Sequence, residues 1–170
     1  GVEKTVLLGT VCSYPKFTPV PFRESSFWDG YPEETNAPYG IAKLAQLVHA
    51  QTAREQYGQS VTYLIPTNLY GPGDNYHPTH SHVLPALIRR FHEAKEGGLE
   101  KVTCWGTGSP MREFLHVDDL GKACVLALEN WSALDEEAPR DDQGKPLAFM
   151  NVGTGVDLTI KELAEQIAAV

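Results

Sequence analysis

The sequence predicts an α/β fold with a mainly parallel sheet. Short apolar runs alternate with longer segments whose apolar residues recur at helical spacing, which indicates alternating strands and helices. The run at residues 4–9 is continuous and ends in glycine, which is typical of a buried strand in a parallel sheet.

The first half is expected to hold two strands and one long helix. Residues 4–9 form the first strand and 60–65 the second. Between them, residues 39–56 carry a helical apolar stripe, and Gly58 follows as a C-terminal helix signal. Residues 13–38 are rich in Pro, Ser, Glu and Asn, so we expect a long active-site loop there.

The second half continues the alternation. Its expected elements are a loop at 66–80, a helix at 83–94, strands at 101–105 and 112–117, a helix after 118, an acidic loop at 131–146, a strand at 147–152 and a helix at 159–170. A carboxylate just before an Ala- and Leu-rich run is a typical helix N-cap, so Asp118 is expected to cap its helix and, with Asp119, to be structural.

The dinucleotide-binding fingerprint is missing from the sequence. No Gly-x-Gly-x-x-Gly follows a first strand, and Gly153-Thr154-Gly155 lacks the third glycine. We therefore interpret the chain as a segment of a longer protein, whose pyrophosphate loop lies upstream and whose C-terminal tail lies downstream. Residues 1–76 would be the C-terminal part of the dinucleotide-binding domain. Residues 77–170 would mix substrate-binding elements with returning strands and helices of the core.

Composition and charge exclude several classes of partner. The chain has 42% hydrophobic and 21% charged residues, as in a globular domain. Its net charge of −8 argues against nucleic-acid and anionic-membrane partners. No signal peptide is recognised, and no apolar run approaches the roughly 18–20 residues that span a bilayer. The cysteines, Cys12, Cys104 and Cys124, are odd in number and far apart, so we expect a reducing, cytoplasmic compartment.

Tyr39 and Lys43 are the candidate catalytic pair. Four residues apart on the expected helix, their side chains project from one face, one turn apart. An ammonium held a few Å from a phenol favours the phenolate, which produces a general acid/base suited to a carbonyl or alcohol oxygen. By itself the pair fits an amphipathic helix with an exposed lysine better than a catalytic pair, so the interpretation depends on the neighbouring motifs.

Those motifs occur in a fixed order along the chain. They are Gly9-Thr10-Val11-Cys12-Ser13-Tyr14-Pro15-Lys16, Pro66-Thr67-Asn68-Leu69-Tyr70-Gly71-Pro72, Ser81-His82-Val83-Leu84-Pro85, Arg89-Arg90-Phe91-His92-Glu93-Ala94 and Trp105-Gly106-Thr107-Gly108-Ser109-Pro110-Met111-Arg112-Glu113-Phe114. From about Val6 onward the chain resembles the extended short-chain dehydrogenase/reductase superfamily of nucleotide-sugar epimerases, dehydratases and reductases. Within that superfamily it is most similar to the GDP-L-fucose synthase family. The resemblance implies a Rossmann-like, doubly wound parallel sheet whose N-terminal part lies outside this chain, with part of a smaller C-terminal substrate-binding domain.

The resemblance implies a catalytic role for five residues. Cys12 is the base and His82 the acid in an epimerisation at C3 and C5 of GDP-4-keto-6-deoxy-D-mannose. Thr10 and Tyr39 contact the C4 oxygen, and Tyr39 then donates a proton during NADPH-dependent reduction at C4. Lys43 supports Tyr39 and binds the nicotinamide ribose. The family usually has Ser-Ser where this chain has Thr10-Val11, so the second hydroxyl is lost here.

The resemblance also implies binding residues. Those expected to bind NADP(H) are Leu8, Gly9, Thr10, Val11, Lys43, Pro66, Thr67, Asn68, Leu69 and His82. Arg90, Trp105 and Arg112 are expected to hold the GDP-sugar, because arginine forks suit diphosphate oxygens and tryptophan offers a flat face. We expect no metal site, because His82 and its histidine neighbours lie on a Pro/Asn loop without nearby carboxylate or thiolate ligands.

A homodimer is implied as well, paired through the Tyr-Lys helix, with Leu47, Val48 and Gln51 at the contact. Two alternatives stay open. One is another 4-epimerase or 4,6-dehydratase of the superfamily, although these usually have Arg-x-x-Asn before Tyr-Gly-Pro and lack the pair Cys12 and His82. The other is a cofactor-deficient fragment that serves only as a binding or assembly module. Whether the chain prefers NADP or NAD is not encoded in this segment.

Overall fold

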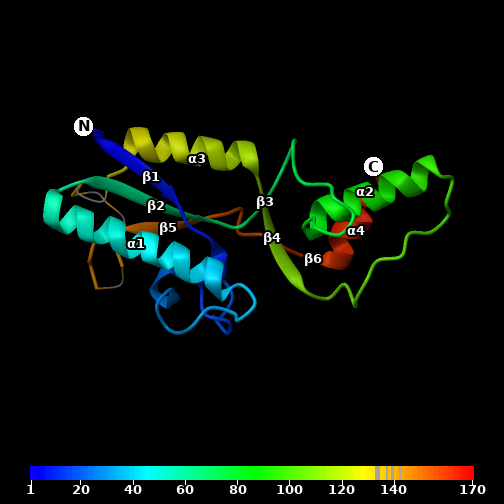
Figure 1. The fold of residues 1–170 in the computed structure, drawn as a ribbon, viewed down its shortest axis with the longest axis horizontal. Helices are drawn as coiled ribbons and strands as arrows, with labels where there is room; N and C mark the ends of the chain where they lie inside the picture. The colour runs from blue at the N-terminus through cyan, green and yellow to red at the C-terminus, as the bar shows by residue number, and fades with distance from the viewer. Residues whose placement is uncertain (133–134, 137, 139, 142) are drawn as a thin grey trace. The chain divides into compact units, whose positions relative to one another are not determined.

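The computed structural model describes residues 1–132, 135–136, 138, 140–141 and 143–170 (Figure 1). The chain divides into two compact units, residues 1–67 with 118–153 and residues 68–117 with 154–170. Each unit has its own three-stranded sheet and its own hydrophobic cluster. No helix in the described residues is long and apolar enough to cross a membrane. The domain boundary expected near residue 76 stays a prediction.

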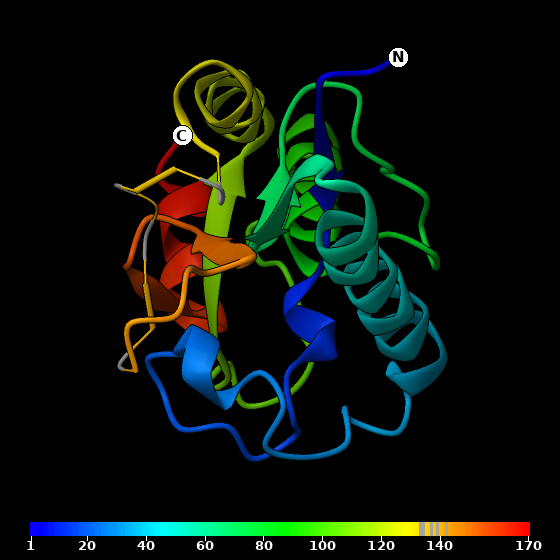
Figure 2. The ribbon, with the colours of Figure 1, turned by 90° about the vertical axis from the view of Figure 1, so that its left-hand side faces the viewer.

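The first unit is built on a parallel sheet. Its strands are β1 (Lys4–Leu8), β2 (Ser60–Pro66) and β5 (Phe149–Val152), in the order β1-β2-β5. Helices α1 (Ala37–Tyr57) and α3 (Val117–Asn130) lie on opposite faces of this sheet (Figures 1 and 2). The α/β class and the strands expected at 4–9, 60–65 and 147–152 are confirmed. Because the strands are parallel, their carboxyl ends meet at one edge.

The core of this unit is centred on Tyr63 of the middle strand. Every residue of β2 from Val61 onward is buried, as expected for a strand covered on both faces. Tyr63 packs with Leu47 of α1 and with Phe27 and Phe149. Its hydroxyl donates to the main-chain carbonyl of Lys43 at 2.8 Å, so the central strand is bonded to the helix above it.

Helix α1 begins and ends where local signals place it. Pro38 lies in its first turn, where a missing N–H costs nothing. Gly58 follows with φ 65°, and its N–H donates to the carbonyl of Arg54. The helix expected at 39–56 is therefore confirmed. Leu47, however, is fully buried against the sheet and cannot contribute to a dimer contact, whereas Val48 is exposed.

The long segment between β1 and α1 is ordered. It contains two short 3-10 helices, η1 (Val11–Ser13) and η2 (Glu24–Ser26), and an isolated bridge joins Pro15 to Pro32. The ring of Phe27 lies edge-on to Tyr14 at 4.7 Å and 5.0 Å from Phe149, measured between ring centroids. These aromatic contacts fold the segment onto the start of β5.

The second unit has a mixed sheet. Strand β3 (Asn68–Tyr70) pairs parallel with β4 (Met111–His116), and β6 (Asp157–Thr159) pairs antiparallel with β4. Helices α2 (Val83–Glu96) and α4 (Ile160–Ala168) pack together through Leu84, Leu87 and Leu163. A capping box between Thr159 and Glu162 begins α4.

Several expectations in the second half are wrong. Residues 101–105 form no strand, because none of the described residues pairs with them. Strands β3 and β6 have three residues each, too few to show a period, and both were missed. Asp118 lies in the first turn of α3, which begins at Val117, so its carboxylate complements the helix dipole and is not the N-cap. Five residues of the loop expected at 131–146 lie outside the described ones.

The two buried tyrosines, Tyr14 and Tyr63, predict a loss of stability in alkali. Burial raises the pKa of both side chains above the ordinary value. Because the folded pKa exceeds the unfolded one, the unfolded state loses these protons first as pH rises. Ionisation of these tyrosines therefore leaves the free energy of unfolding unchanged below about pH 10. Above that pH the free energy of unfolding falls by about 1.4 kcal/mol per pH unit for each tyrosine.

Urea unfolding at several pH values on either side of about 10 measures this effect. The variant Tyr14→Phe should show a shallower alkaline decline than the unchanged chain, because one buried phenol is gone. An identical slope in the two proteins would contradict the assignment.

Candidate active site

The candidate site lies at the carboxyl edge of the parallel sheet in the first unit. Thr10 follows β1 there, and Thr67 follows β2. The Thr10 hydroxyl oxygen is buried and accepts the N–H of Cys12 at 3.2 Å, which begins η1. Because that oxygen serves as acceptor, its own hydrogen is left to donate to another group.

Lys43 lies at the same edge. Its ammonium donates to the carbonyl of Leu8 at 2.7 Å and stands 5.9 Å from the centre of the Tyr39 ring. The two side chains share a face of α1, as their spacing predicts. Tyr39 is 53% exposed, so its hydroxyl can meet a ligand. An ammonium has three N–H groups, and the carbonyl of Leu8 accepts only one of them.

Cys12 reaches the helix that carries this pair. The buried hydroxyl of Ser13 donates to the carbonyl of Gly40 at 3.0 Å. A Cβ built on Gly40 would lie only 2.6 Å from the carbonyl oxygen of Cys12, so the backbones of η1 and α1 touch at that position. Gly40 directly follows Tyr39, and the fold therefore brings Cys12 to the turn of α1 that holds the candidate acid/base.

Gly9, which follows β1, allows the backbone to pack directly against the ring of Tyr63. Its N–H donates to the carbonyl of Leu64 at 2.7 Å. A Cβ at Gly9 would stand 2.3 Å from the ring of Tyr63, which is fully buried and bonded through its hydroxyl. The ring cannot move aside without breaking that bond, so this position admits only glycine.

Thr67 offers a buried hydroxyl with no partner among the described residues. Its main-chain N–H donates to the carbonyl of Val152, which keeps Thr67 at the carboxyl edge. A buried hydroxyl without a hydrogen bond costs about 1–3 kcal/mol. Together with the two remaining N–H groups of Lys43, it forms a polar lining at the edge where doubly wound sheets bind nucleotides. These residues fit a nicotinamide nucleotide.

Leu8, Val11 and Pro66 belong to the first unit, whereas three further cofactor candidates belong to the second. Asn68 and Leu69 lie in β3, where the amide of Asn68 donates to the carbonyl of Glu113 at 2.9 Å. His82 is the exposed residue before the first turn of α2. The rings of His77 and His80 stack nearby in sequence, with centroids 4.8 Å apart. Whether His82 meets Tyr39 or Cys12 stays a prediction, because they belong to different units.

The substrate candidates Arg90 and Trp105 meet in the second unit. The guanidinium carbon of Arg90 lies 3.9 Å from the centre of the Trp105 ring, although the indole is 76% exposed. Stacking uses the flat face of the guanidinium and leaves its N–H edge free of the indole. Arg112, on β4, is also exposed and donates to the carbonyl of Met111. The sequence could not reveal the stack, because residues 101–105 have no regular period.

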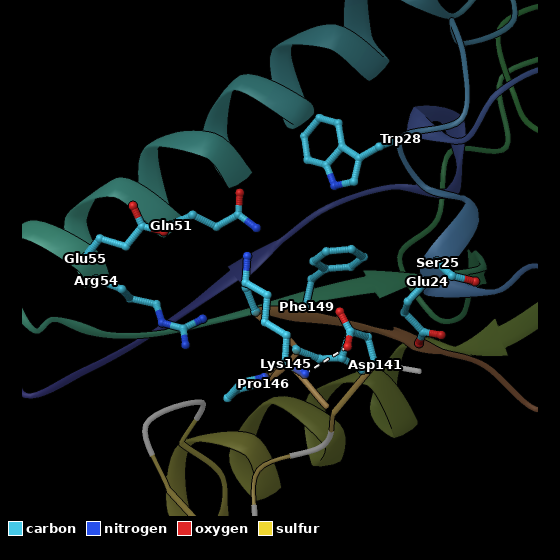
Figure 3. Close-up of a pocket in the computed structure, with 12 residues that line it drawn as sticks. Glu24, Ser25, Trp28, Gln51, Arg54, Glu55, Asp141, Lys145, Pro146 and Phe149 are labelled. Carbon is cyan, nitrogen blue, oxygen red and sulfur yellow. Dashed lines mark hydrogen bonds between the residues drawn. The ribbon is translucent and has the colours of Figure 1, made fainter. Parts of the chain in front are cut away.

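The sequence also gave no signal for a cavity of about 380 Å³ beside the C-terminal half of α1 (Figure 3). Its lining mixes the charges of Arg54, Lys145 and Asp141 with Trp28, and burial lowers the pKa of Arg54. The carboxylate of Asp141 accepts the main-chain N–H of Lys145 and so shapes the turn. Along α1, the rise per residue separates Tyr39 from the lining residue Gln51 by about 18 Å. The cavity is therefore not part of the candidate site.

The chain has clear relatives. Residues 1–139 match the NAD dependent epimerase/dehydratase family. The whole chain is 50% identical to GDP-L-fucose synthase 1 of Arabidopsis thaliana, and 169 residues are 48% identical to GDP-L-fucose synthase of Escherichia coli K12. It covers 49% and 51% of these proteins, respectively, and so spans about half the length of the curated relatives it matches.

A solved relative shares the fold. A GDP-mannoheptose C4 reductase from Campylobacter jejuni with NADP bound superimposes with a TM-score of 0.82 at 27% identity. The match covers 99% of this chain and 56% of that one.

Replacing Gly40 should displace Cys12 from the helix. In Gly40→Ala the new methyl group would meet the Cys12 carbonyl, a backbone atom that cannot rotate away, and we expect the free energy of unfolding to fall by about 1–3 kcal/mol. Gly121→Ala in α3 is the matched control. Its methyl group meets nothing within 4 Å and should stabilise the helix by up to about 1 kcal/mol. Urea unfolding compares the two, and equal effects would refute the close contact.

Proposed function

This chain belongs to the NAD dependent epimerase/dehydratase family, and we propose that it carries the catalytic residues of an NADPH-dependent nucleotide-sugar epimerase-reductase. The proposed full-length protein converts GDP-4-keto-6-deoxy-D-mannose to GDP-L-fucose by epimerisation at C3 and C5 and reduction at C4. The identity with curated GDP-L-fucose synthases over the whole chain supports this substrate.

One observation carries the proposal. The contact of Gly40 with the Cys12 carbonyl sets a thiol-bearing residue beside the turn that holds Tyr39. A reductase that acts on C4 needs the tyrosine and lysine but has no use for a second base. An enzyme that also inverts carbons next to the ketone does need one. The neighbouring position of Cys12 and Tyr39 therefore favours the combined reaction over simple reduction.

The epimerisation follows from these residues. The Cys12 thiolate takes the proton from a carbon next to the C4 ketone, and the C–H electron pair moves to form an enolate. The hydroxyl hydrogens of Tyr39 and Thr10 hold the developing charge on the C4 oxygen. His82 returns a proton to the opposite face of the carbon, which inverts it. Cys12 then loses the abstracted proton to solvent and His82 regains one, after which the step repeats at the second carbon next to the ketone.

The reduction uses the same oxygen contacts. Bound NADPH supplies the hydride for C4. Tyr39 donates its phenolic proton to the C4 oxygen as the alcohol forms, and the ammonium of Lys43, fixed by the Leu8 carbonyl, lies near enough to stabilise the phenolate that results. The nicotinamide cofactor accords with the family. The choice of NADPH is supported by the NADP bound in the reductase neighbour.

Arg90, Trp105 and Arg112 are proposed to hold the GDP-sugar. The Arg90 edge is suited to diphosphate oxygens, and the exposed indole can cover the guanine or the sugar. A cytoplasmic location is proposed on the basis that all three cysteines are free thiols.

A homodimer through α1 is also proposed, with exposed Ile41 and Val48 in place of the buried Leu47. These two side chains lie seven residues apart, two turns along one face of the helix, which suits packing against a second copy. Light scattering on the full-length protein tests the assembly. A monomer at micromolar concentration would overturn it.

Two variants should separate the two half-reactions in the full-length protein. With substrate and NADPH in heavy water, Cys12→Ser should lower deuterium incorporation at C3 and C5 by about 10²–10⁴-fold and largely spare C4 reduction. Tyr39→Phe should lower reduction by a similar factor and lower exchange much less, because the Thr10 hydroxyl still contacts the C4 oxygen. Mass spectrometry of the sugar reads both steps.

Matched controls are available for both variants. Cys104→Ser removes an exposed free thiol in the second unit, and Tyr57→Phe removes an exposed phenol at the far end of α1. Both controls should react like the unchanged protein. Loss of exchange and reduction together in Cys12→Ser would count against its role as the base.

A further inference from the structure

Asn151, near the end of β5, connects three parts of the segment that follows the candidate base. Its side-chain oxygen accepts the hydroxyl of Tyr14 at 2.7 Å. Its side-chain nitrogen donates to the carbonyl of Phe22 at 3.2 Å, and its main-chain N–H donates to a carboxylate oxygen of Glu24 at 2.8 Å. Asn151 thus forms hydrogen bonds with three residues of the segment, Tyr14, Phe22 and Glu24.

The orientation of the Asn151 amide is fixed by one hydrogen-bond donor and one acceptor. Tyr14 donates a hydroxyl hydrogen, whereas the carbonyl of Phe22 can only accept. Tyr14 is almost fully buried between the rings of Phe22 and Phe27, and burial raises the pKa of its phenol, so that it remains a donor at neutral pH. An amide satisfies both partners at once, while a carboxylate would oppose the Phe22 carbonyl.

Cys12 is the residue whose position this network affects most directly. Of the two residues that follow it, Ser13 is bonded to Gly40 on α1, and Tyr14 is bonded to Asn151 on β5. The short helix that carries the thiol is therefore held at two neighbouring points, on the helix of Tyr39 and on the edge strand. Loss of the second point leaves η1 with its bond to α1 and its N-cap at Thr10, but without the bond to β5.

We propose that Asn151 is a positioning residue for Cys12, which acts through Tyr14 to fix the thiol relative to Tyr39. This inference rests on the proposed function for its catalytic consequence, but the positioning itself is a property of the fold. Asn151 opens the run Asn151-Val152-Gly153-Thr154-Gly155, whose glycines do not match the dinucleotide fingerprint. The hydrogen bonds to residues 14–24 give this run a role of a different kind.

The first test measures the position of the thiol without any substrate. Alkylation of the chain by iodoacetamide, followed by mass spectrometry of the peptides, reports Cys12, Cys104 and Cys124 separately. Loss of one hydrogen bond of about 1 kcal/mol should raise the population in which the segment is open, and so the labelling of Cys12, by roughly fivefold. We expect this rise in Asn151→Ala and in Tyr14→Phe.

The other two cysteines separate positioning from general instability. Cys124 is half-buried in α3, and Cys104 is exposed in the second unit. Their labelling should stay unchanged in both variants. Asn130→Ala is the matched control, because the Asn130 side chain donates to the carbonyl of Leu126 within α3 and, among the described residues, to no part of the Cys12 segment. A parallel rise of Cys124 with Cys12, or no rise of Cys12, would overturn the proposal.

The second test uses the full-length protein in heavy water. Displacing a catalytic group by about 1 Å can cost up to about 10²-fold in rate. Asn151→Ala and Tyr14→Phe should therefore reduce deuterium exchange at C3 and C5 more than they reduce hydride transfer to C4. Equal losses in both steps would overturn the positioning role. If the unchanged protein shows no exchange at all, the proposed function fails, while the labelling result still decides the positioning role.

Discussion

The hydroxyl of Tyr63 bonds the central strand of the parallel sheet to α1 through the carbonyl of Lys43. The ring beneath that hydroxyl is fully buried, and it occupies the space where any side chain at position 9 would have to lie. The end of β1, the middle of β2 and helix α1 therefore depend on one aromatic side chain. The ammonium of Lys43 lies between Leu8 and the Tyr39 ring because its own backbone is held in this way.

The candidate site is organised by backbone contacts more than by charge. Gly40 lets the Cys12 carbonyl approach α1, and the hydroxyl of Ser13 closes the same contact. On the other side, Tyr14 reaches Asn151 at the end of β5. A group that must take a proton from carbon has to be placed to within a fraction of an ångström. Two attachments to different elements restrict the thiol more than one could.

The second unit has a stacked arginine and tryptophan at its surface, which suits the proposed binding of an anionic ligand. Arg90 belongs to a regular helix, and Trp105 belongs to an irregular segment. Their stack holds the guanidinium by its face, so less side-chain freedom is lost when its edge binds an anion. In the first unit, by contrast, the hydroxyls of Thr10 and Ser13 are buried and bonded to backbone groups.

The sequence by itself determined those features that arise from neighbours along the chain. The long apolar stripe and Gly58 defined α1, the continuous apolar runs defined β1 and β2, and the four-residue spacing placed Tyr39 and Lys43 on one face. Tertiary structure decided the rest. It buried Leu47, left residues 101–105 without a strand partner, and joined Tyr14 to Asn151 across 137 positions. Contacts between residues so far apart leave no period or capping signal in the sequence, because they exist only once the sheet has assembled.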